Sequence, residues 1–382
     1  MTQATNSGAA LRAHYPVTAH ETFLNHAAVG PISTGVMAAV QAQMLRHAND
    51  PFAMSSANHT IAAEGRRRAA RLVGAAPENI AYVQNTSHGI SLIANGLGLG
   101  AGDNVVLSAA EFPSNTLPWL RLASAGVEVR RVAPDAGRMT QDAVRPAIDA
   151  NTRVLALSHV QYWNGHRCDL AALATLCRER DILLVVDGTQ SIGAMRLDMA
   201  ASGVDALVVS AHKWMLGPLG IGFMALAPRA IDRVGVTIPG WLAVNEPFAF
   251  RNALDYLPDA RRFEPGTENA GGICGLVERL REIDDYGIAA IEARVLGLVE
   301  AIAEAASRRG ADVDLHPAVG ERSGILTFRL RGADNAAAVR HLLERKVRVS
   351  LRNGAIRVSP HYYNDQSDIA ALFQGLESFQ PA

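Results

Sequence analysis

The chain has 382 residues, of which 49% are hydrophobic and 19% charged, a composition typical of a well-packed globular protein and not of a disordered one. Its formal net charge of −1 offers no basis for attraction to nucleic acid or to an anionic membrane, and no apolar run is long enough to span a bilayer. At this length two domains are expected.

The cysteine content and the first residues of the chain indicate the cellular compartment of the protein. Three cysteines, Cys168, Cys177 and Cys274, are too few and too irregularly spaced for a disulfide framework or a zinc site. Residues 1–10 are small and polar, without the basic start and apolar core of a signal peptide. We therefore expect a cytoplasmic protein without a metal site.

The first two thirds of the chain predict an α/β domain. After an N-terminal arm (1–22), helices are expected near 34–47 and 60–73. Helical periodicity over stretches such as 87–97, 115–125 and 169–180 then alternates with short apolar runs. This alternation predicts a mostly parallel seven-stranded sheet, covered on both faces, in a large domain over 23–282. The strands are expected at 80–84, 104–108, 127–132, 153–157, 182–187, 206–210 and 220–226.

The pattern changes at about residue 283. A long helix near 288–309 is followed by a strand at 324–330 and a helix at 335–345. Strands near 347–351 and 355–359 and a last helix from 365 complete the chain. These elements predict a small C-terminal α+β domain over 283–382.

Two polar residues follow buried strands of the large domain. Asp187 ends the run 182–187, and Lys213 comes soon after the run 206–210. Open α/β sheets bind ligands at the carboxyl ends of their strands, so both side chains should meet one ligand. Pyridoxal phosphate chemistry needs this pair, because an amine forms the Schiff base and a carboxylate keeps the pyridinium nitrogen protonated.

A phosphate site is expected at the start of the helix near 87–97. Thr86 and Ser87 follow a strand, and the free N–H groups and hydroxyls of such a helix start bind anions. Ser210 and His212 lie beside Lys213 and could reach the same phosphate. An ordinary Ser/Thr helix cap is the alternative interpretation of Thr86 and Ser87.

Three motifs together resemble a known family. Thr-Ser at a helix start, Asp-Gly-Thr-Gln at 187–190 and Ser-Ala-His-Lys at 210–213 resemble class V of the fold-type I pyridoxal phosphate enzymes. That class contains cysteine desulfurases, selenocysteine lyases, kynureninase and isopenicillin N epimerase. The resemblance runs from about Phe23 to the C-terminus. It implies the fold-type I transferase fold, pyridoxal 5′-phosphate as cofactor, Lys213 as Schiff-base lysine and Asp187 as pyridinium partner.

The resemblance implies further contacts. It places Gln190 near the ring hydroxyl of the cofactor, and it places the phosphate at Thr86, Ser87, Ser210 and His212. Residues 262–267 are similar to the family segment whose threonine reaches the phosphate across a dimer interface. Thr267 would therefore serve the neighbouring subunit of a homodimer with shared active sites.

The chain departs from the desulfurase pattern in three places. Phe112 occupies the position of a histidine over the ring, and it can stack on the cofactor but cannot transfer protons, unless it is simply a core aromatic. Tyr162 aligns with an asparagine near the ring hydroxyl, although Gln161 or Asn164 could serve instead. The short stretch 350–360 has no cysteine, so no thiolate could accept a persulfide there.

Substrate binding is assigned mainly to one arginine. Arg357 matches the family arginine that grips the substrate α-carboxylate, which a guanidinium fork can hold through two parallel hydrogen bonds. The alternatives are Arg352 as the carboxylate ligand, or Arg357 on the solvent face of a strand. His26 resembles a residue of isopenicillin N epimerase-like members and is a further substrate-binding candidate, although a lone histidine is more often structural.

These assignments predict an enzyme that binds an amino acid as a Schiff base and forms a Cα carbanion. A β-eliminating carbon–sulfur lyase and an aminotransferase are the main expectations, with an epimerase as the third. A regulator or scaffold that kept the fold is the non-enzyme alternative, which would not be expected to keep Lys213, Asp187 and Arg357 together.

Overall fold

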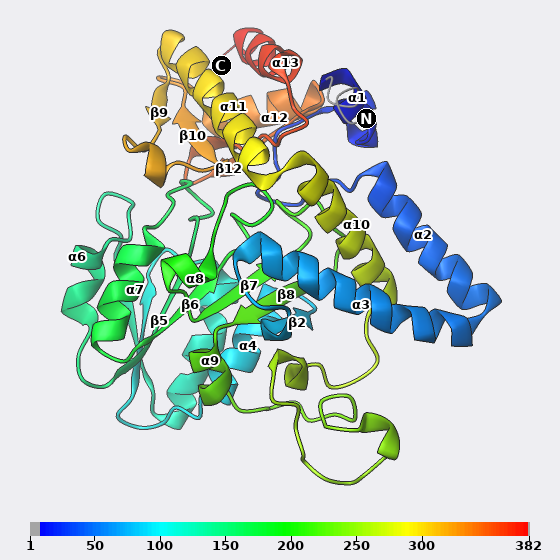
Figure 1. Cartoon of the computed structure of the whole chain (residues 1–382). Helices are drawn as coiled ribbons and strands as arrows, with labels where there is room; N and C mark the ends of the chain where they lie inside the picture. The colour runs from blue at the N-terminus through cyan, green and yellow to red at the C-terminus, as the bar shows by residue number, and fades with distance from the viewer. Residues whose placement is uncertain (1–7, 381–382) are drawn as a thin grey trace.

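The computed structural model describes residues 8–380, which form two bodies (Figure 1). The larger body contains a seven-stranded sheet, and the smaller one contains a four-stranded sheet covered by the C-terminal helices. No helix within residues 8–380 is long and apolar enough to cross a bilayer. The predicted domain boundaries, at 22/23 and 282/283, stay predictions.

The large sheet has the strand order β2-β8-β7-β6-β5-β3-β4. β8 runs antiparallel to both of its neighbours, and the other pairs are parallel, so the prediction of a mostly parallel seven-stranded sheet is confirmed. The bounds are β2 (Ile80–Val83), β3 (Asn104–Ser108), β4 (Glu128–Val132), β5 (Thr152–Ser158), β6 (Leu183–Asp187), β7 (Ala206–Ser210) and β8 (Gly222–Leu226).

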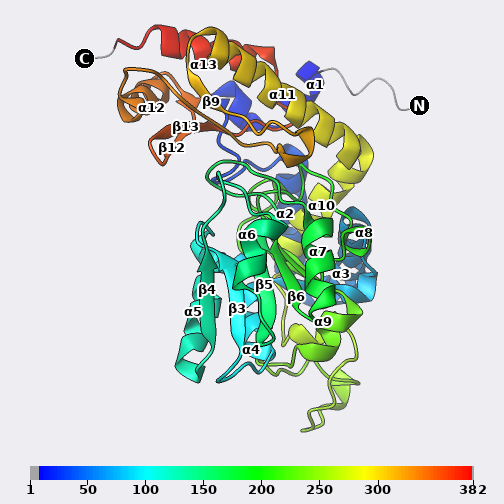
Figure 2. The ribbon, with the colours of Figure 1, turned by 90° about the vertical axis from the view of Figure 1, so that its left-hand side faces the viewer.

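Helices cover both faces of this sheet (Figure 2). Alternate residues of a strand point to opposite faces, so Leu184 and Val186 join one core while Val185 joins the other. The first core includes side chains of α3 (Pro51–Val73), α7 (Leu170–Glu179) and α10 (Ala270–Tyr286). The second includes side chains of α4 (Thr86–Gly96), α5 (Leu117–Leu120) and α9 (Pro228–Arg233). The remaining short helices of this body are α6 (Gln141–Val144) and α8 (Met199–Ser202).

Two helices differ from their predicted extents. α3 begins nine residues earlier than expected, because Asp50 caps it by accepting from the N–H of Ala53 and Pro51 occupies its first turn. The continuous helix expected over 115–125 was wrong. Pro118 cannot donate a backbone hydrogen bond, so the chain starts a new short helix, α5, and passes into a 3₁₀ turn, Arg121–Ala125.

The small body is built around the sheet β12-β13-β10-β9, in which all neighbours are antiparallel. The strand expected over 347–351 is two strands, because β11 (Val347–Arg348) pairs with the N-terminal β1 (Thr22–Phe23) while β12 (Ser350–Arg352) pairs with β13 (Ala355–Val358). The other elements are β9 (Asp312–Asp314), β10 (Leu326–Arg329), α11 (Ile288–Arg308), α12 (Asn335–Glu344) and α13 (Gln366–Glu377).

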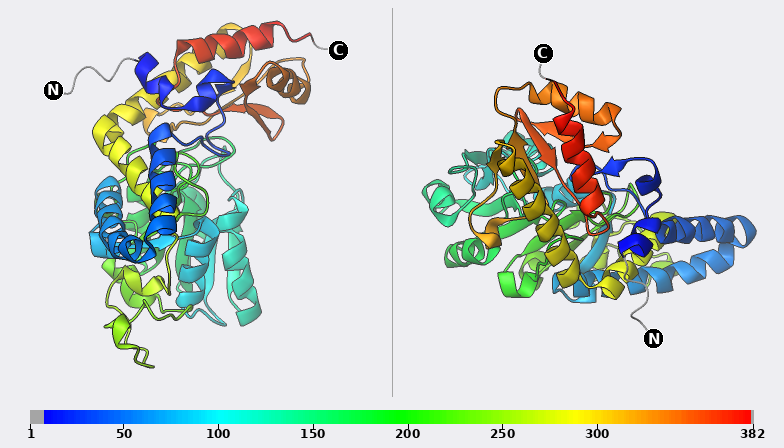
Figure 3. Two further views of the ribbon diagram at one scale, coloured as in Figure 1. Left: turned by 90° about the vertical axis from the view of Figure 1, so that its right-hand side faces the viewer. Right: turned by 90° about the horizontal axis from the view of Figure 1, so that it is seen from above.

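The N-terminal arm lies against the small body (Figure 3). Within α1 (Gly8–Ala13), Arg12 forms an ion pair with Asp368 of α13. Residues 1–7 of the predicted arm lie outside the described residues. The chain then enters α2 (Thr34–Asn49), which packs on α10 and projects with α3 from one end of the molecule. Residues 22–30 connect the small body, where β1 pairs with β11, to the segment after β7, where the Gly30 N–H donates to the carbonyl of His212.

Candidate active site

Neighbouring strands of the large sheet end in polar residues at one edge. β5, β6 and β7 end in Ser158, Asp187 and Ser210, and β2 is followed directly by the polar start of α4. These strand ends line a cavity of 480 Å³ that the small body helps to close. The cavity brings together these predicted residues: Thr86, Ser87, Phe112, Tyr162, Asp187, Gln190, Ser210, His212, Lys213 and Arg357.

Lys213 and Asp187 face the same cavity. The Lys213 Nζ lies 5.0 Å from the centre of the Phe112 ring and makes no hydrogen bond or ion pair with another residue of the described chain. Burial lowers the pKa of the Lys213 amine; the Asp187 carboxylate opposes this shift, and the cationic Arg357 adds to it. A lowered pKa increases the fraction of neutral, nucleophilic amine.

Burial is also the main influence on the pKa of Asp187, which is 6% exposed. Burial raises the pKa of the Asp187 carboxyl, although Oδ1 accepts a hydrogen bond from the Thr189 N–H at 2.8 Å. A buried carboxylate is stabilised by a cationic partner. The cavity therefore suits a ligand that presents a positive charge to Asp187.

Three hydroxyls meet at the start of α4. The Thr86 Oγ1 lies 2.6 Å from the Thr189 Oγ1 and 2.8 Å from the Ser210 Oγ. Asn85 caps the helix by accepting from the His88 N–H, while the Thr86 N–H donates to the Ser210 Oγ at 2.8 Å. This helix start offers hydroxyl donors and a positive dipole end to an anion.

Arg357 reaches the cavity from β13 of the small body. It is 1% exposed and donates to three neutral acceptors: the Ser350 Oγ, the carbonyl of Tyr162 and the Asn25 Oδ1. Within residues 8–380 it has no carboxylate partner. Burial lowers the pKa of Arg357 to about 9, and the nearby Arg352 adds to this effect. A buried guanidinium with only neutral partners favours binding of an anion.

Comparison with known proteins shows the family of the chain. The model of the aminotransferase class-V family matches residues 22–372. The chain belongs to this family. A cysteine desulfurase of Klebsiella pneumoniae subsp. pneumoniae is 30% identical over 408 aligned positions, which cover 96% of this chain and 97% of the relative. A probable cysteine desulfurase of Methanothermobacter thermautotrophicus is 29% identical over 336 positions, covering 82% of each.

A solved structure shares the fold. A mutant of C-DES with glycine covalently linked to its PLP cofactor superposes with a TM-score of 0.90 at 22% identity, over 97% of this chain and 99% of that one. The predicted fold type is therefore confirmed. The predicted enzyme class and cofactor are also confirmed, since this class V member is a pyridoxal-phosphate-dependent enzyme. The expectation of a lyase or aminotransferase that acts on amino acids is confirmed at the level of the family.

The cavity fits pyridoxal phosphate residue by residue. An amine without a hydrogen-bond partner, a buried carboxylate and a hydroxyl-rich helix start suit its aldehyde, ring nitrogen and phosphate, respectively. Phe112 is 38% exposed and presents its ring beside Lys213. Gln190 lines the cavity with both ends of its amide engaged, because it donates to the carbonyl of Ala27 and accepts from the Trp214 indole.

The structure distinguishes the three residues that the sequence offered for the ring hydroxyl by whether they line the cavity. Tyr162 lines the cavity, and its ring lies 5.3 Å from that of Phe112 in an edge-to-face arrangement. Gln161 is buried and donates to Glu111, while the Asn164 amide donates to the carbonyl of Gly137. Of the three, Tyr162 is the one that faces this class V cavity.

Two predicted residues do not line the cavity. His26 is fully buried, with Nδ1 2.7 Å from the carbonyl of Ser359 and Nε2 2.7 Å from the Tyr363 hydroxyl. Both ring nitrogens are therefore engaged, and burial lowers the pKa of His26 to about 3. Thr267 is exposed and lines a different hollow with Gln84 and His88.

Other residues of the site were not selected from the sequence. Glu111 is buried and accepts from the N–H and hydroxyl of Ser158, and so holds the end of β5. Gly30 donates to the carbonyl of His212, and a Cβ there would lie 2.4 Å from the carbonyl oxygen of Lys213. A side chain at Gly30 would displace the residue that carries the amine. Thr189 is part of the Asp-Gly-Thr-Gln motif, but nothing in the sequence indicated that its hydroxyl would contact Thr86.

Proposed function

We propose that this class V enzyme is a carbon–sulfur lyase: it eliminates a sulfur substituent from Cβ of an amino acid and does not keep the sulfur on a cysteine of its own. The relatives named cysteine desulfurase support a sulfur-containing amino acid as substrate. With cysteine, the balanced reaction consumes water and yields pyruvate, ammonia and hydrogen sulfide.

The observation that carries this proposal is the hairpin before Arg357. β12 and β13 are joined by Asn353 and Gly354 alone, both with positive φ, 48° and 73°. This is the two-residue turn that Asn-Gly favours, and it leaves no loop that could bring a thiolate to the substrate. A desulfurase that carries a persulfide would need such a thiolate.

The cysteines of the chain offer no substitute. Cys168, Cys177 and Cys274 are all buried, and none of them lines the cavity. Burial raises the pKa of each thiol, that of Cys177 to about 12. A thiol is a poor nucleophile when it stays protonated, so sulfur released from Cβ would leave the site.

The chain's own residues divide the remaining work. Arg357 would hold the α-carboxylate and so orient Cα, while Lys213 would take the Cα proton, since Phe112 cannot. Thr86, Ser87, Ser210 and His212 would hold the phosphate, with Gln190 and Tyr162 near the ring hydroxyl. When bound, the cofactor supplies the electron sink, and Asp187 would keep its ring nitrogen protonated.

We also propose that the enzyme is a homodimer in which Thr267 contacts the phosphate bound in the neighbouring subunit. Its exposure and its distance in the chain from the cavity-lining motifs are compatible with service to another copy. A cytoplasmic location is proposed from the three free cysteines, since reducing compartments preserve thiols.

Product analysis tests the lyase proposal. The holoenzyme is incubated with cysteine, and pyruvate, ammonia and sulfide are measured without any keto-acid acceptor. Equal amounts of pyruvate and ammonia are expected, and Lys213→Ala should form neither. Turnover that requires an added keto acid would establish an aminotransferase instead, and a change of Cα configuration without pyruvate would establish an epimerase.

A further inference from the structure

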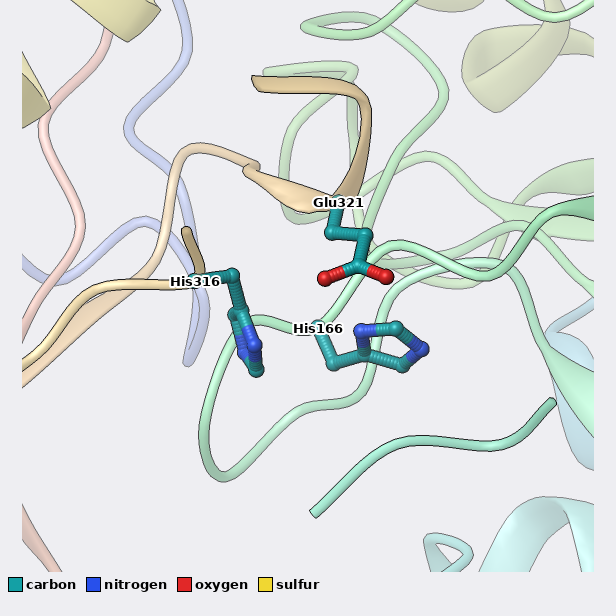
Figure 4. A group of neighbouring side chains, drawn as sticks. All are labelled: His166, His316 and Glu321. Atoms are coloured by element: carbon teal, nitrogen blue, oxygen red, sulfur yellow. The ribbon is translucent and has the colours of Figure 1, made fainter. Parts of the chain in front are cut away.

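A second cluster of titratable side chains joins the two bodies outside the cavity described above. His166 lies in the connection between β5 and α7 of the large body, while His316 and Glu321 lie between β9 and β10 of the small one. Figure 4 shows the two imidazoles and the carboxylate converging on one another. One ligand atom from each residue lies within 4.8 Å of the others.

These side chains lack the partners that buried polar groups normally have. His166 is 2% exposed and His316 is 7% exposed. Neither ring nitrogen of His166, nor Nε2 of His316, nor Oε2 of Glu321 makes a hydrogen bond within residues 8–380. The nearest backbone groups are those of Met139 beside His166 and of Asn164 beside His316. Such unpaired groups are costly, which indicates that a ligand satisfies them.

The donor set indicates the kind of ligand. Each neutral imidazole offers a nitrogen lone pair for coordination, and Glu321 offers a carboxylate oxygen. Two imidazoles and one carboxylate suit zinc and similar transition metals, whereas magnesium and calcium prefer oxygen ligands throughout.

We propose that His166, His316 and Glu321 bind one divalent transition-metal ion, of the zinc class, that joins the large and small bodies. Ligands of tetrahedral zinc with bonds of about 2.1 Å lie about 3.4 Å apart, so the present spacing requires side-chain movements of about 1 Å. The fourth position can be filled by water, because His166 and Glu321 also line a hollow of 800 Å³ through which an ion can enter.

The surrounding backbone already holds the two halves of the cluster together. The Arg167 N–H donates to the carbonyl of Glu321 at 2.8 Å, and the Ser323 hydroxyl donates to the carbonyl of Gly165 at 2.6 Å. The main chain around His166 is therefore held beside that around Glu321 before a metal binds. A preformed site of this kind loses less conformational entropy on binding.

One neighbouring charge opposes the metal and another favours it. The Arg138 Nη1 lies 3.5 Å from the Glu321 Oε1, where it competes with a cation for the carboxylate. The negative charge of the Asp314 carboxylate lies near His316, where it attracts a cation. Removing the Arg138 charge should therefore strengthen metal binding, which a merely structural role of the cluster would not produce.

The test measures metal binding by the full-length holoenzyme without an affinity tag. After dialysis against a chelator, the protein is titrated with Zn²⁺, and with Co²⁺ as a coloured probe. We expect one ion per chain, visible absorption typical of tetrahedral Co²⁺ with nitrogen ligands, and a higher unfolding midpoint with metal.

Four variants locate the site. His166→Gln, His316→Gln and Glu321→Gln should each weaken Zn²⁺ binding by more than about tenfold, a loss seen even for outer-shell changes. Arg138→Gln should strengthen it. The cofactor absorbance of each variant verifies that it has folded with an intact active site.

Two controls exclude other ligands. Cys168→Ser alters a thiol that lines the same hollow, and His47→Gln removes an exposed histidine at the end of α2. Both should bind Zn²⁺ as the parent does. The proposal is overturned if the parent binds no stoichiometric metal, or if binding survives all three ligand substitutions.

Discussion

Replacing Arg357 by leucine is expected to remove most of the affinity for α-amino acids while leaving the cofactor in place. A guanidinium has five N–H donors, and three of those of Arg357 are used by Ser350, Tyr162 and Asn25. Two remain for a carboxylate in the cavity, which is the number that a bidentate pair needs. Leucine fills a similar volume without either donor or charge.

The magnitude follows from these two hydrogen bonds. A hydrogen bond to a charged group contributes about 1.5–3 kcal/mol, and part of this is offset because the free cavity is solvated. A net loss of about 2–4 kcal/mol corresponds to about 30- to 1,000-fold in KM. Arg357→Lys keeps the charge but loses the fork, so a smaller increase is expected.

The matched control is Arg352→Leu. Arg352 lines the same cavity, yet it donates only to the carbonyl of its neighbour Leu351. Steady-state kinetics with an amino acid, together with the visible absorbance of the cofactor, should separate the two variants. An unchanged KM in Arg357→Leu, with a large increase in Arg352→Leu, would move the carboxylate site to Arg352. Loss of the cofactor from Arg357→Leu would refute the assignment altogether.

Three further outcomes are expected. Asp187→Asn should retain the cofactor but slow exchange of the substrate Cα hydrogen in deuterated water by orders of magnitude, because the ring nitrogen loses its anionic partner. Near-normal exchange would show that Asp187 is misassigned. The Cys168/Cys177/Cys274→Ser protein should keep its activity, and a protein-bound persulfide detected by mass spectrometry of the parent during turnover would contradict this. His26 has a pKa of about 3 when folded and about 6.5 when unfolded, so below about pH 6.5 only the unfolded chain takes up the proton. His26→Gln should therefore lessen the fall in unfolding free energy by about 1.4 kcal/mol per pH unit between about pH 6 and pH 4, measured with urea. An unchanged slope would mean that His26 is protonated in the folded protein.

The parts of the fold that the sequence predicted well are those with local causes. Each buried strand of the large sheet is a short apolar run, and a polar residue at its end marks the ligand edge, as with Asp187 and Ser210. The start of α4 was predictable for the same reason, since Thr86 comes three residues after the end of the strand β2. The start of α5 at Leu117 also has a local cause, Pro118 in its first turn, which the predicted helix over 115–125 overlooked.

Other features depend on partners that are distant in sequence. β1 has only two residues and exists because it pairs with β11, more than 300 residues later. His26 looked like a residue of a binding loop, but Ser359 and Tyr363 surround it in the folded chain. No property of the segment around His26 indicates that these partners would enclose it.

The cluster of His166, His316 and Glu321 shows the same limit, and it also connects the two sites. No metal motif was visible because His166 and His316 are 150 positions apart and come from different bodies. The connection after β5 carries both His166 and Tyr162, whose carbonyl accepts from Arg357. This connection, the hairpin that bears Arg357 and the β9–β10 segment thus form one continuous set of contacts between the bodies. A metal that fixes His166 would therefore restrain the same loop that helps to orient the proposed carboxylate ligand, Arg357.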